Sequence, residues 1–328
     1  MAASAPTWTR ILARAVVAIT SPLGAWLPPS WVRARVRALV DAGEADAALL
    51  LGHQALAHGQ ARDPEDAAWI AFHTGRAAHA KGLADQARSR FARAAAWLPG
   101  EPTFAFALGW SLRDERRFDP AREALEAAER LAPTDPRIPY LLGLTLRDLE
   151  RTDEARAPFE RVLALNPKDV RARYALGLCL YEGKRLDEAL PHFETVTRLD
   201  AKHMRGHYQT GAVHLALGRL SQAEAPLRRA LALRADFGPT HYALGRVLAP
   251  RDETAARRHL LEALTLRPAV VVAWLELGRL HERAGRLGPA IQAYDEYLRA
   301  HPNAPGHEGL RRHLFELRAA RAASTSAP

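Results

Sequence analysis

The clearest indication of the fold comes from residues 274–302, WLELGRLHERAGRLGPAIQAYDEYLRAHP. Its marker positions are a tryptophan, a leucine–glycine pair, a second glycine, an alanine, a tyrosine and a proline: Trp274, Leu277, Gly278, Gly285, Ala290, Tyr294 and Pro302. Apolar residues three and four positions apart lie on both sides of Gly285, a pattern that predicts two helices joined by a turn. Pro302 ends the second helix, because proline has no N–H and hinders a helical conformation in the residue before it.

These markers recur along the chain with a period of 34 residues, shortened once to 33. The glycine column is Gly75, Gly109, Gly143, Gly177, Gly211, Gly245 and Gly278. The alanine column is Ala87, Ala121, Ala155, Ala189, Ala223, Ala256 and Ala290, and large apolar residues recur at Phe91, Leu125, Phe159, Phe193, Leu227, Leu260 and Tyr294. We place the missing residue in the turn around Pro250, where a deletion disturbs least. A fixed period of this length predicts a solenoid of stacked units.

Small residues explain how the two helices of one period approach each other. Residues 174–182 (YALGLCLYE) have helical apolar spacing, and helical periodicity resumes at Leu186 after Gly183. Two helices come close only where their side chains are small, so we expect the glycine column on the first helix and the alanine column on the second to mark the crossing. Proline follows most second helices, with alanine in two exceptional repeats, at Ala201 and Ala235.

The pattern W-x2-L-G … A-x3-[FY] … P with a period of 34 residues resembles the tetratricopeptide repeat family. The resemblance implies an all-α, right-handed superhelical solenoid of about eight helix-turn-helix repeats with a C-terminal capping helix. We expect a degenerate repeat over residues 29–67, seven clear repeats over 68–304, the capping helix over 305–321 and a disordered tail over 322–328. The cap is needed because the last repeat of a solenoid has no neighbour to cover its apolar side.

The resemblance also implies that the first helices of successive repeats line a concave groove. An aromatic ladder follows these helices at intervals of 34 residues: Phe72, Phe106, Tyr140, Tyr174, Tyr208 and Tyr242. Arginine recurs three positions earlier in three repeats, at Arg137, Arg171 and Arg205, and the same helix faces carry Trp69, Trp110, Arg147, Tyr181, Arg246 and Arg279. These residues form the predicted partner-binding groove, because rings supply apolar area and arginine pairs with carboxylates in two-pronged contacts.

Other interpretations of the groove residues are open. An aromatic ring at the ladder position in this family also packs between neighbouring first helices, and the arginines can form solvated ion pairs from repeat to repeat. Two recognition modes of the family are disfavoured: the Lys/Asn set that holds a terminal carboxylate, and the Asn ladder that holds an extended backbone. Asn166 and Asn303 are the two asparagines of the chain, and both lie near repeat ends.

The sequence predicts no catalytic, cofactor or metal site, so we expect a protein that is not an enzyme. No glycine-rich phosphate loop follows a predicted strand, and no nucleophile-elbow motif occurs. The one cysteine, Cys179, lies between leucines in a first helix and is interpreted as a buried small apolar residue. Four histidines, His203, His207, His214 and His241, have spacings that could bring metal ligands together, but we favour packing or surface roles for them.

Residues 1–28 do not follow the repeat, and three interpretations of this segment are open. Residues 7–20 have the pattern of an amphipathic, arginine-bearing helix, and Trp8, Trp26 and Trp31 are residues typical of a membrane interface. The segment is therefore interpreted as a membrane-surface anchor or partner-binding helix, as an N-terminal cap on the first repeat, or as a targeting peptide.

Charge is distributed unevenly along the 328 residues. The chain has 46 basic and 37 acidic groups, a net charge of +9, but residues 41–304 hold 37 basic and 35 acidic groups, a net charge of +2. A nearly neutral body argues against a nucleic-acid groove along the whole chain. The abundance of arginine and alanine over lysine favours a bacterial source.

The function expected from these observations is that of a protein–protein interaction scaffold or adaptor. It would bind a peptide or helix in its groove and assist the assembly of a membrane-associated complex, in the cytoplasm or at the inner face of the membrane. Two alternatives come from other classes of function: a basic nucleic-acid-associated repeat protein, and a regulatory subunit of a separate membrane enzyme or secretion system.

Overall fold

The computed structural model describes residues 28–57, 63–266, 270–302 and 307–326 of the chain. Within these residues the protein contains 17 helices and no strand, which confirms the predicted all-α fold. The predicted N-terminal segment lies outside the described residues, apart from Pro28. No helix among those described is both long and apolar enough to cross a lipid bilayer.

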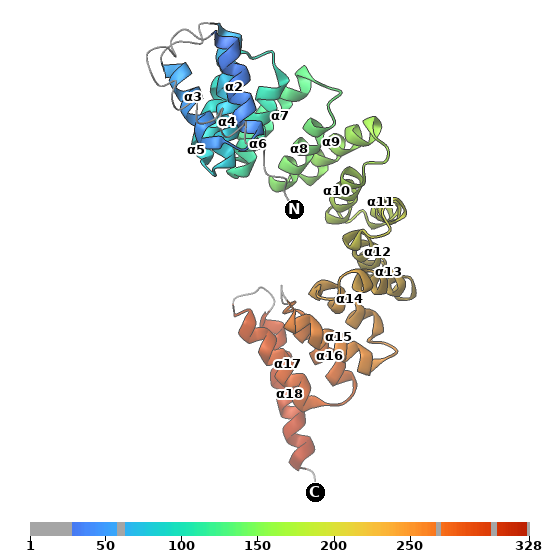
Figure 1. The fold of residues 1–328 in the computed structure, drawn as a ribbon. Coiled ribbons are helices and arrows are strands. Elements are labelled where there is room, and N and C mark those ends of the chain that lie inside the picture. Colours follow the sequence, from blue (N-terminus) through green and yellow to red (C-terminus); the bar gives the residue numbers. More distant parts are fainter. Residues whose placement is uncertain (1–27, 58–62, 267–269, 303–306, 327–328) are drawn as a thin grey trace. The chain divides into compact units, whose positions relative to one another are not determined.

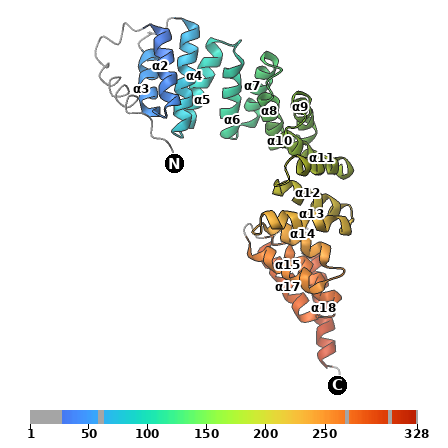
Figure 2. The same cartoon turned by 45° about the vertical axis from the view of Figure 1, so that its right-hand side comes forward.

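Two compact units make up the chain, residues 1–172 and residues 173–328. The first unit contains four helical hairpins, coloured blue to green in Figure 1: α2 (Pro29–Asp41) with α3 (Ala45–Ala57), α4 (Pro64–Ala80) with α5 (Ala84–Trp97), α6 (Pro102–Asp114) with α7 (Phe118–Leu131), and α8 (Arg137–Asp148) with α9 (Thr152–Leu165). The second helices α3, α5 and α7 also pack against the first helices of the hairpins that follow them, α4, α6 and α8. The hairpins of this unit therefore stack in tandem, side by side in both views (Figures 1 and 2).

The second unit begins inside helix α10 (Val170–Glu182) and stacks its hairpins in the same way. Its other helices are α11 (Leu186–Leu199), α12 (Met204–Ala216), α13 (Leu220–Leu233), α14 (Gly238–Leu248), α15 (Glu253–Thr265), α16 (Ala273–Arg283), α17 (Leu287–Ala300) and α18 (His307–Ser326). The eight hairpins of the two units, counted within the described residues, and the terminal helix match the number of repeats and the cap expected from the sequence.

The glycine column lies where the two helices of a hairpin touch. A Cβ atom placed on Gly75 would lie 2.7 Å from Cε1 of Phe91, and one on Gly177 would lie 2.8 Å from Cε1 of Phe193. In every regular hairpin the closest atoms belong to the large residue of the second helix, 16 positions later or 15 in the shortened repeat. The predicted crossing is thus present, but the glycine makes room chiefly for this large side chain. The alanine column is fully buried beside it: Ala87, Ala121, Ala155, Ala189, Ala223, Ala256 and Ala290.

The turn inside each hairpin usually contains one residue in the left-handed backbone region. Glycine occupies it in some repeats, as at Gly218 with φ of 72°, because glycine has no Cβ to clash there. In the repeat of α10 and α11 this residue is Lys184, with φ of 59°, and not the neighbouring Gly183 that marked the turn in the sequence. The shortened repeat has its turn at residues 249–252, around Pro250, and the shortening falls at the end of α14, which has 11 residues where α12 has 13.

Helix α18 is the predicted C-terminal cap. Leu314 and Leu317 are buried against the last hairpin, together with the partly buried Leu310. Two carboxylate contacts hold the same helix: Arg318 to Asp295 at 2.8 Å, and His313 Nε2 to Glu282 at 3.0 Å.

The expected disordered tail from residue 322 is wrong for residues 322–326, because the helix extends to Ser326. Ala322 and Ala323 have high helix propensity, and the sequence has no proline between His307 and Pro328. Residues 327 and 328 lie outside the described part of the chain.

Candidate partner-binding surface

The aromatic ladder of the first unit lies on α4, α6 and α8 with its rings half-buried. The Phe72 ring centroid lies 5.9 Å from that of Phe91 and 5.4 Å from that of Phe104. Tyr140 meets Phe159 edge-on at 5.9 Å. Each of these rings is therefore anchored on one edge by the core, while its other side is accessible to a partner.

The second unit repeats the arrangement with tyrosines on α10, α12 and α14. The Tyr174 ring lies 5.7 Å from that of Phe193 and 5.1 Å from that of His203. Tyr208 contacts Phe237 edge-on at 5.3 Å. Burial, reinforced by the neighbouring tyrosines, raises the pKa of Tyr208 to about 12, and burial also raises the pKa of Tyr242. The phenols of Tyr208 and Tyr242 thus stay neutral at physiological pH and can donate hydrogen bonds.

Arginine side chains extend the ladder of the first unit. The guanidinium carbon of Arg137 lies 5.5 Å from the ring centroid of Phe106, and that of Arg171 lies 4.9 Å from the ring centroid of Tyr140. A cation at this distance is attracted by the negative face of the ring. In both cases the arginine of one first helix therefore contacts the ladder ring of the preceding first helix.

Each of these two arginines also faces a carboxylate on its own repeat. Arg137 forms a two-pronged pair with Asp135, with distances of 3.0 Å from Nε and 2.6 Å from Nη2, and the guanidinium lowers the pKa of that carboxyl. Arg171 lies 3.6 Å from Asp169. Both arginines thus form ion pairs, but each pair lies within one repeat and not from repeat to repeat as the alternative interpretation expected.

Arg205, the third member of the series, has a different environment. Its position two residues earlier is occupied by His203, whose Nδ1 accepts a hydrogen bond from the backbone N–H of Gly206 at 2.9 Å and so caps α12. Within the described residues no carboxylate pairs with Arg205, and its side chain is exposed. The three ladder arginines occupy equivalent positions in the sequence. Arg137 and Arg171 each have a carboxylate partner, whereas Arg205 has none among the described residues.

The other predicted groove residues divide between the two units. In the first unit Trp69 packs on Phe104 with a centroid distance of 4.8 Å, Trp110 lies 4.0 Å from His79, and Arg147 is half-buried.

In the second unit Tyr181 is half-buried, and Arg246 lies over the ring of Tyr242 at 5.8 Å. Arg246 and Arg279 share the carboxylate of Glu276, at 3.8 Å and 3.0 Å. Glu276 was not among the predicted groove residues. Its spacing of three residues from Arg279 on α16 is the signal that could have identified it.

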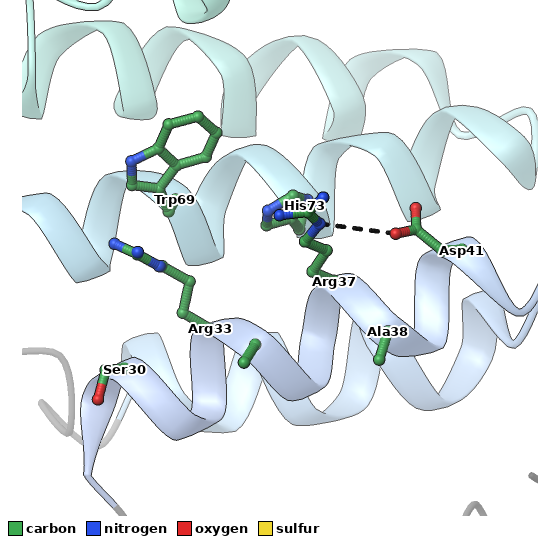
Figure 3. A pocket seen from close by; sticks show the side chains of 8 residues that line it. Ser30, Arg33, Arg37, Ala38, Asp41, Trp69 and His73 are labelled. Atoms are coloured by element: carbon green, nitrogen blue, oxygen red, sulfur yellow. Dashed lines mark ion pairs between the residues drawn. The ribbon is translucent and has the colours of Figure 1, made fainter.

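Figure 3 shows a pocket of about 400 Å³ between α2 and α4 of the first unit. Its walls include Arg33, Arg37, Asp41, Trp69 and His73. The Arg33 guanidinium lies 3.1 Å from Glu65, and Arg37 lies 3.6 Å from Asp41. Because each cation is matched by a carboxylate, the pocket presents no excess charge to a ligand.

One buried and one half-buried histidine give the fold a predicted sensitivity to acid. Burial, assisted by Arg76, lowers the pKa of His73 to about 4, and burial beside His241 lowers the pKa of His259 to about 4. The unfolded chain binds these protons near the ordinary pKa of 6.5, whereas the folded chain binds them only near pH 4. The free energy of unfolding is therefore highest above pH 6.5 and decreases as the pH falls toward 4.

Lowering the pH from 7.5 to 5 is therefore expected to destabilise the protein, by up to about 2 kcal/mol for the nearly fully buried His73. Urea unfolding at the two pH values, followed by circular dichroism, measures this loss. His73→Gln should remove its share of the pH dependence, since glutamine does not titrate. Equal stability of the wild-type protein at both pH values would contradict the lowered pKa values of His73 and His259.

The histidines considered for metal binding have structural partners. The rings of His207 and His241 contact the carbonyl oxygens of Ala201 and Ala235 at 3.1 Å and 3.0 Å, in the two repeats that lack the proline. His241 Nδ1 lies 3.0 Å from His259 Nδ1, and His214 is buried. Within the described ranges no three histidine, cysteine or acidic side chains are grouped as metal ligands. Cys179 is 1% exposed.

Comparison with known proteins identifies one sequence family and several similar structures. The family model named tetratricopeptide repeat matches residues 72–136, 140–201, 185–239 and 251–305. The crystal structure of YrrB, a TPR protein with an unusual peptide-binding site, is similar with a TM-score of 0.52 and 24% identity, covering 58% of this chain and 97% of that chain. No curated protein sequence matches the chain significantly.

Two further solved structures show how far the likeness extends. The structure of PilF from Pseudomonas aeruginosa gives a TM-score of 0.55 at 18% identity, over 65% of this chain and 97% of that chain. The crystal structure of MamA gives a TM-score of 0.48 at 22% identity, over 49% of this chain and 94% of that chain. At such identities the likeness concerns the fold alone.

Proposed function

Because the chain belongs to the tetratricopeptide repeat family, we propose that it is a non-catalytic scaffold that captures a peptide or helix of another protein on the ladder faces of its first helices. The single observation that carries the proposal is the half-buried ladder itself: Phe72, Phe106 and Tyr140 in one unit, Tyr174, Tyr208 and Tyr242 in the other. The peptide-binding site described for YrrB supports this direction.

The physical advantage of such a ladder is its rigidity. Each ring with a core contact, such as Tyr140 against Phe159 or Tyr208 against the buried cluster that contains Leu227, is already ordered before a partner arrives. A partner then loses less conformational freedom on the protein side than it would against mobile side chains. Aromatic anchors of this kind dominate the free energy of binding in many interfaces.

Assembly of a membrane-associated complex is the finer part of the proposal. It is supported by the sequence of residues 1–28 alone, where an arginine-bearing amphipathic pattern occurs together with Trp8 and Trp26. The proposed capture of a partner does not depend on this segment.

Selection from a displayed library of random 12-residue peptides, with the full chain as bait, tests the proposal. The triple variant Tyr174→Ala, Tyr208→Ala and Tyr242→Ala should bind the selected peptides about tenfold more weakly or worse, because three apolar anchors are removed. Fluorescence anisotropy of a labelled peptide, at a temperature well below the unfolding midpoint of the variant, measures the change.

A matched control removes exposed apolar side chains from second helices. Leu199 and Leu261 are 40% and 45% exposed on α11 and α15, and Leu199→Ala with Leu261→Ala should leave the affinity within about twofold. A folded ladder variant that binds as tightly as the wild-type protein, or a wild-type chain that selects no peptide at all, would refute the proposed function.

A further inference from the structure

The charge of the ladder changes at one defined place in the second unit. In the first unit Arg137 and Arg171 are matched by the aspartates two residues before them, Asp135 at 2.6 Å and Asp169 at 3.6 Å. In the next repeat the equivalent position holds His203, which is neutral when it caps α12 through Nδ1. Arg205 therefore stands on the ladder with its charge uncompensated.

Acidic side chains are missing from the whole length of two consecutive first helices. The sequence has no aspartate or glutamate between Asp200 and Glu224, a range that includes α12, and none between Asp236 and Asp252, a range that includes α14. The arginines of these helices are Arg205 and Arg246. The nearest carboxylate to Arg246 is Glu276 of α16, which lies 3.8 Å away and is closer to Arg279.

Three ladder tyrosines lie on the helices that carry these two cations or on the first helix before them. Tyr208 and Tyr242 lie on the same helices, three positions after Arg205 and four before Arg246, and Tyr174 lies on α10. All three rings are half-buried, whereas both guanidinium groups are exposed, and that of Arg246 lies 5.8 Å from the ring centroid of Tyr242. A carboxylate that pairs with such an arginine forms charge-assisted hydrogen bonds, and the neighbouring rings offer apolar contact to the same partner.

We infer that the first-helix face of α12 and α14 binds an acidic segment of a partner protein, which places an aspartate or glutamate against Arg205 and apolar side chains against Tyr174, Tyr208 and Tyr242. This inference rests on the proposed function and names the chemistry of the partner. The ladder of the first unit has no such preference, because its arginines already have carboxylates. Two arginines are few for a phosphate backbone, whose binding depends on many neutralised charges.

The test uses the same random 12-residue peptide library with the full chain and three variants. Peptides selected by the wild-type chain should be enriched in aspartate and glutamate over the input library. Arg205→Gln should abolish the enrichment and weaken binding of an acidic selected peptide about three- to tenfold, and Arg205→Glu should shift selection toward lysine and arginine. Arg198→Gln is the matched control, because it removes another exposed arginine of the second unit from the second helix α11, outside the ladder, and it should retain the enrichment.

Arg205 is exposed at the start of α12, so its variants should unfold at the same urea concentration as the wild-type chain. Peptides selected without acidic enrichment would overturn the inference and leave the proposed function standing, whereas failure to select any peptide would refute both. Equal effects of Arg205→Gln and Arg198→Gln would overturn it as well. So would displacement of the bound acidic peptide by a generic single-stranded RNA of 20 nucleotides in wild-type protein but not in Arg205→Gln, because that outcome assigns the face to nucleic acid.

Discussion

Gly177→Leu is expected to lower the free energy of unfolding by about 1–3 kcal/mol or more. Even a Cβ atom at this position would lie 2.8 Å from Cε1 and 3.0 Å from Cζ of Phe193. Phe193 is fully buried and cannot swing away, so α10 and α11 would have to move apart along their contact. Urea unfolding followed by the helical circular dichroism signal measures the loss.

The matched control for this change is Gly309→Leu. Gly309 lies in α18, and a Cβ atom there would meet nothing within 4 Å. Leucine has a higher helix propensity than glycine, so the control should be neutral or stabilise the protein by up to about 1 kcal/mol. A Gly177→Leu protein as stable as the wild-type protein would contradict the helix crossing at this glycine.

Phe193→Ala is expected to destabilise the protein by about 3–5 kcal/mol. Its ring is fully buried, fills the space that Gly177 leaves open, and supports Tyr174 of the ladder at a centroid distance of 5.7 Å. Truncation therefore leaves a cavity at the helix crossing and also removes a support of the partner-binding face. Urea unfolding gives the stability, and the affinity for a selected peptide gives the effect on the face.

Phe315→Ala makes the same chemical change on the surface. Phe315 of α18 is 74% exposed, so its removal should change the free energy of unfolding by less than about 0.5 kcal/mol. An equal decrease in the free energy of unfolding of the two phenylalanine variants would contradict the burial of Phe193 inside the hairpin.

The fold could be predicted from the sequence because the same pattern of small and large residues recurs in seven repeats. The glycine at 177 and the large residue at 193 recur at a constant separation, and a helical hairpin is the structure that places such a pair in contact. The limits of the helices were less predictable. The end of α18 at Ser326 depends on the propensity of a short alanine-rich stretch, and the left-handed residue of one turn is Lys184 although a glycine precedes it.

The candidate site could be predicted only as a set of positions. A constant period places Tyr174 and Tyr208 on equivalent faces, but the period does not give the depth of each ring or the partner of each arginine. Those depend on single residues outside the ladder: an aspartate at 135 compensates Arg137, whereas His203 leaves Arg205 uncompensated. Alignment of the repeats at the position two residues before the arginine contains this signal, although side-chain distances were needed to show its effect.

A crosslinking map on the intact chain measures directly whether the faces of the first helices bind the partner. A peptide selected by the wild-type protein is synthesised with a benzophenone group, irradiated in the complex, and the attachment sites are identified by mass spectrometry. Attachment is expected on first helices, at or beside ladder residues such as Tyr208. Attachment confined to second helices, such as α11, α13 and α15, would contradict it.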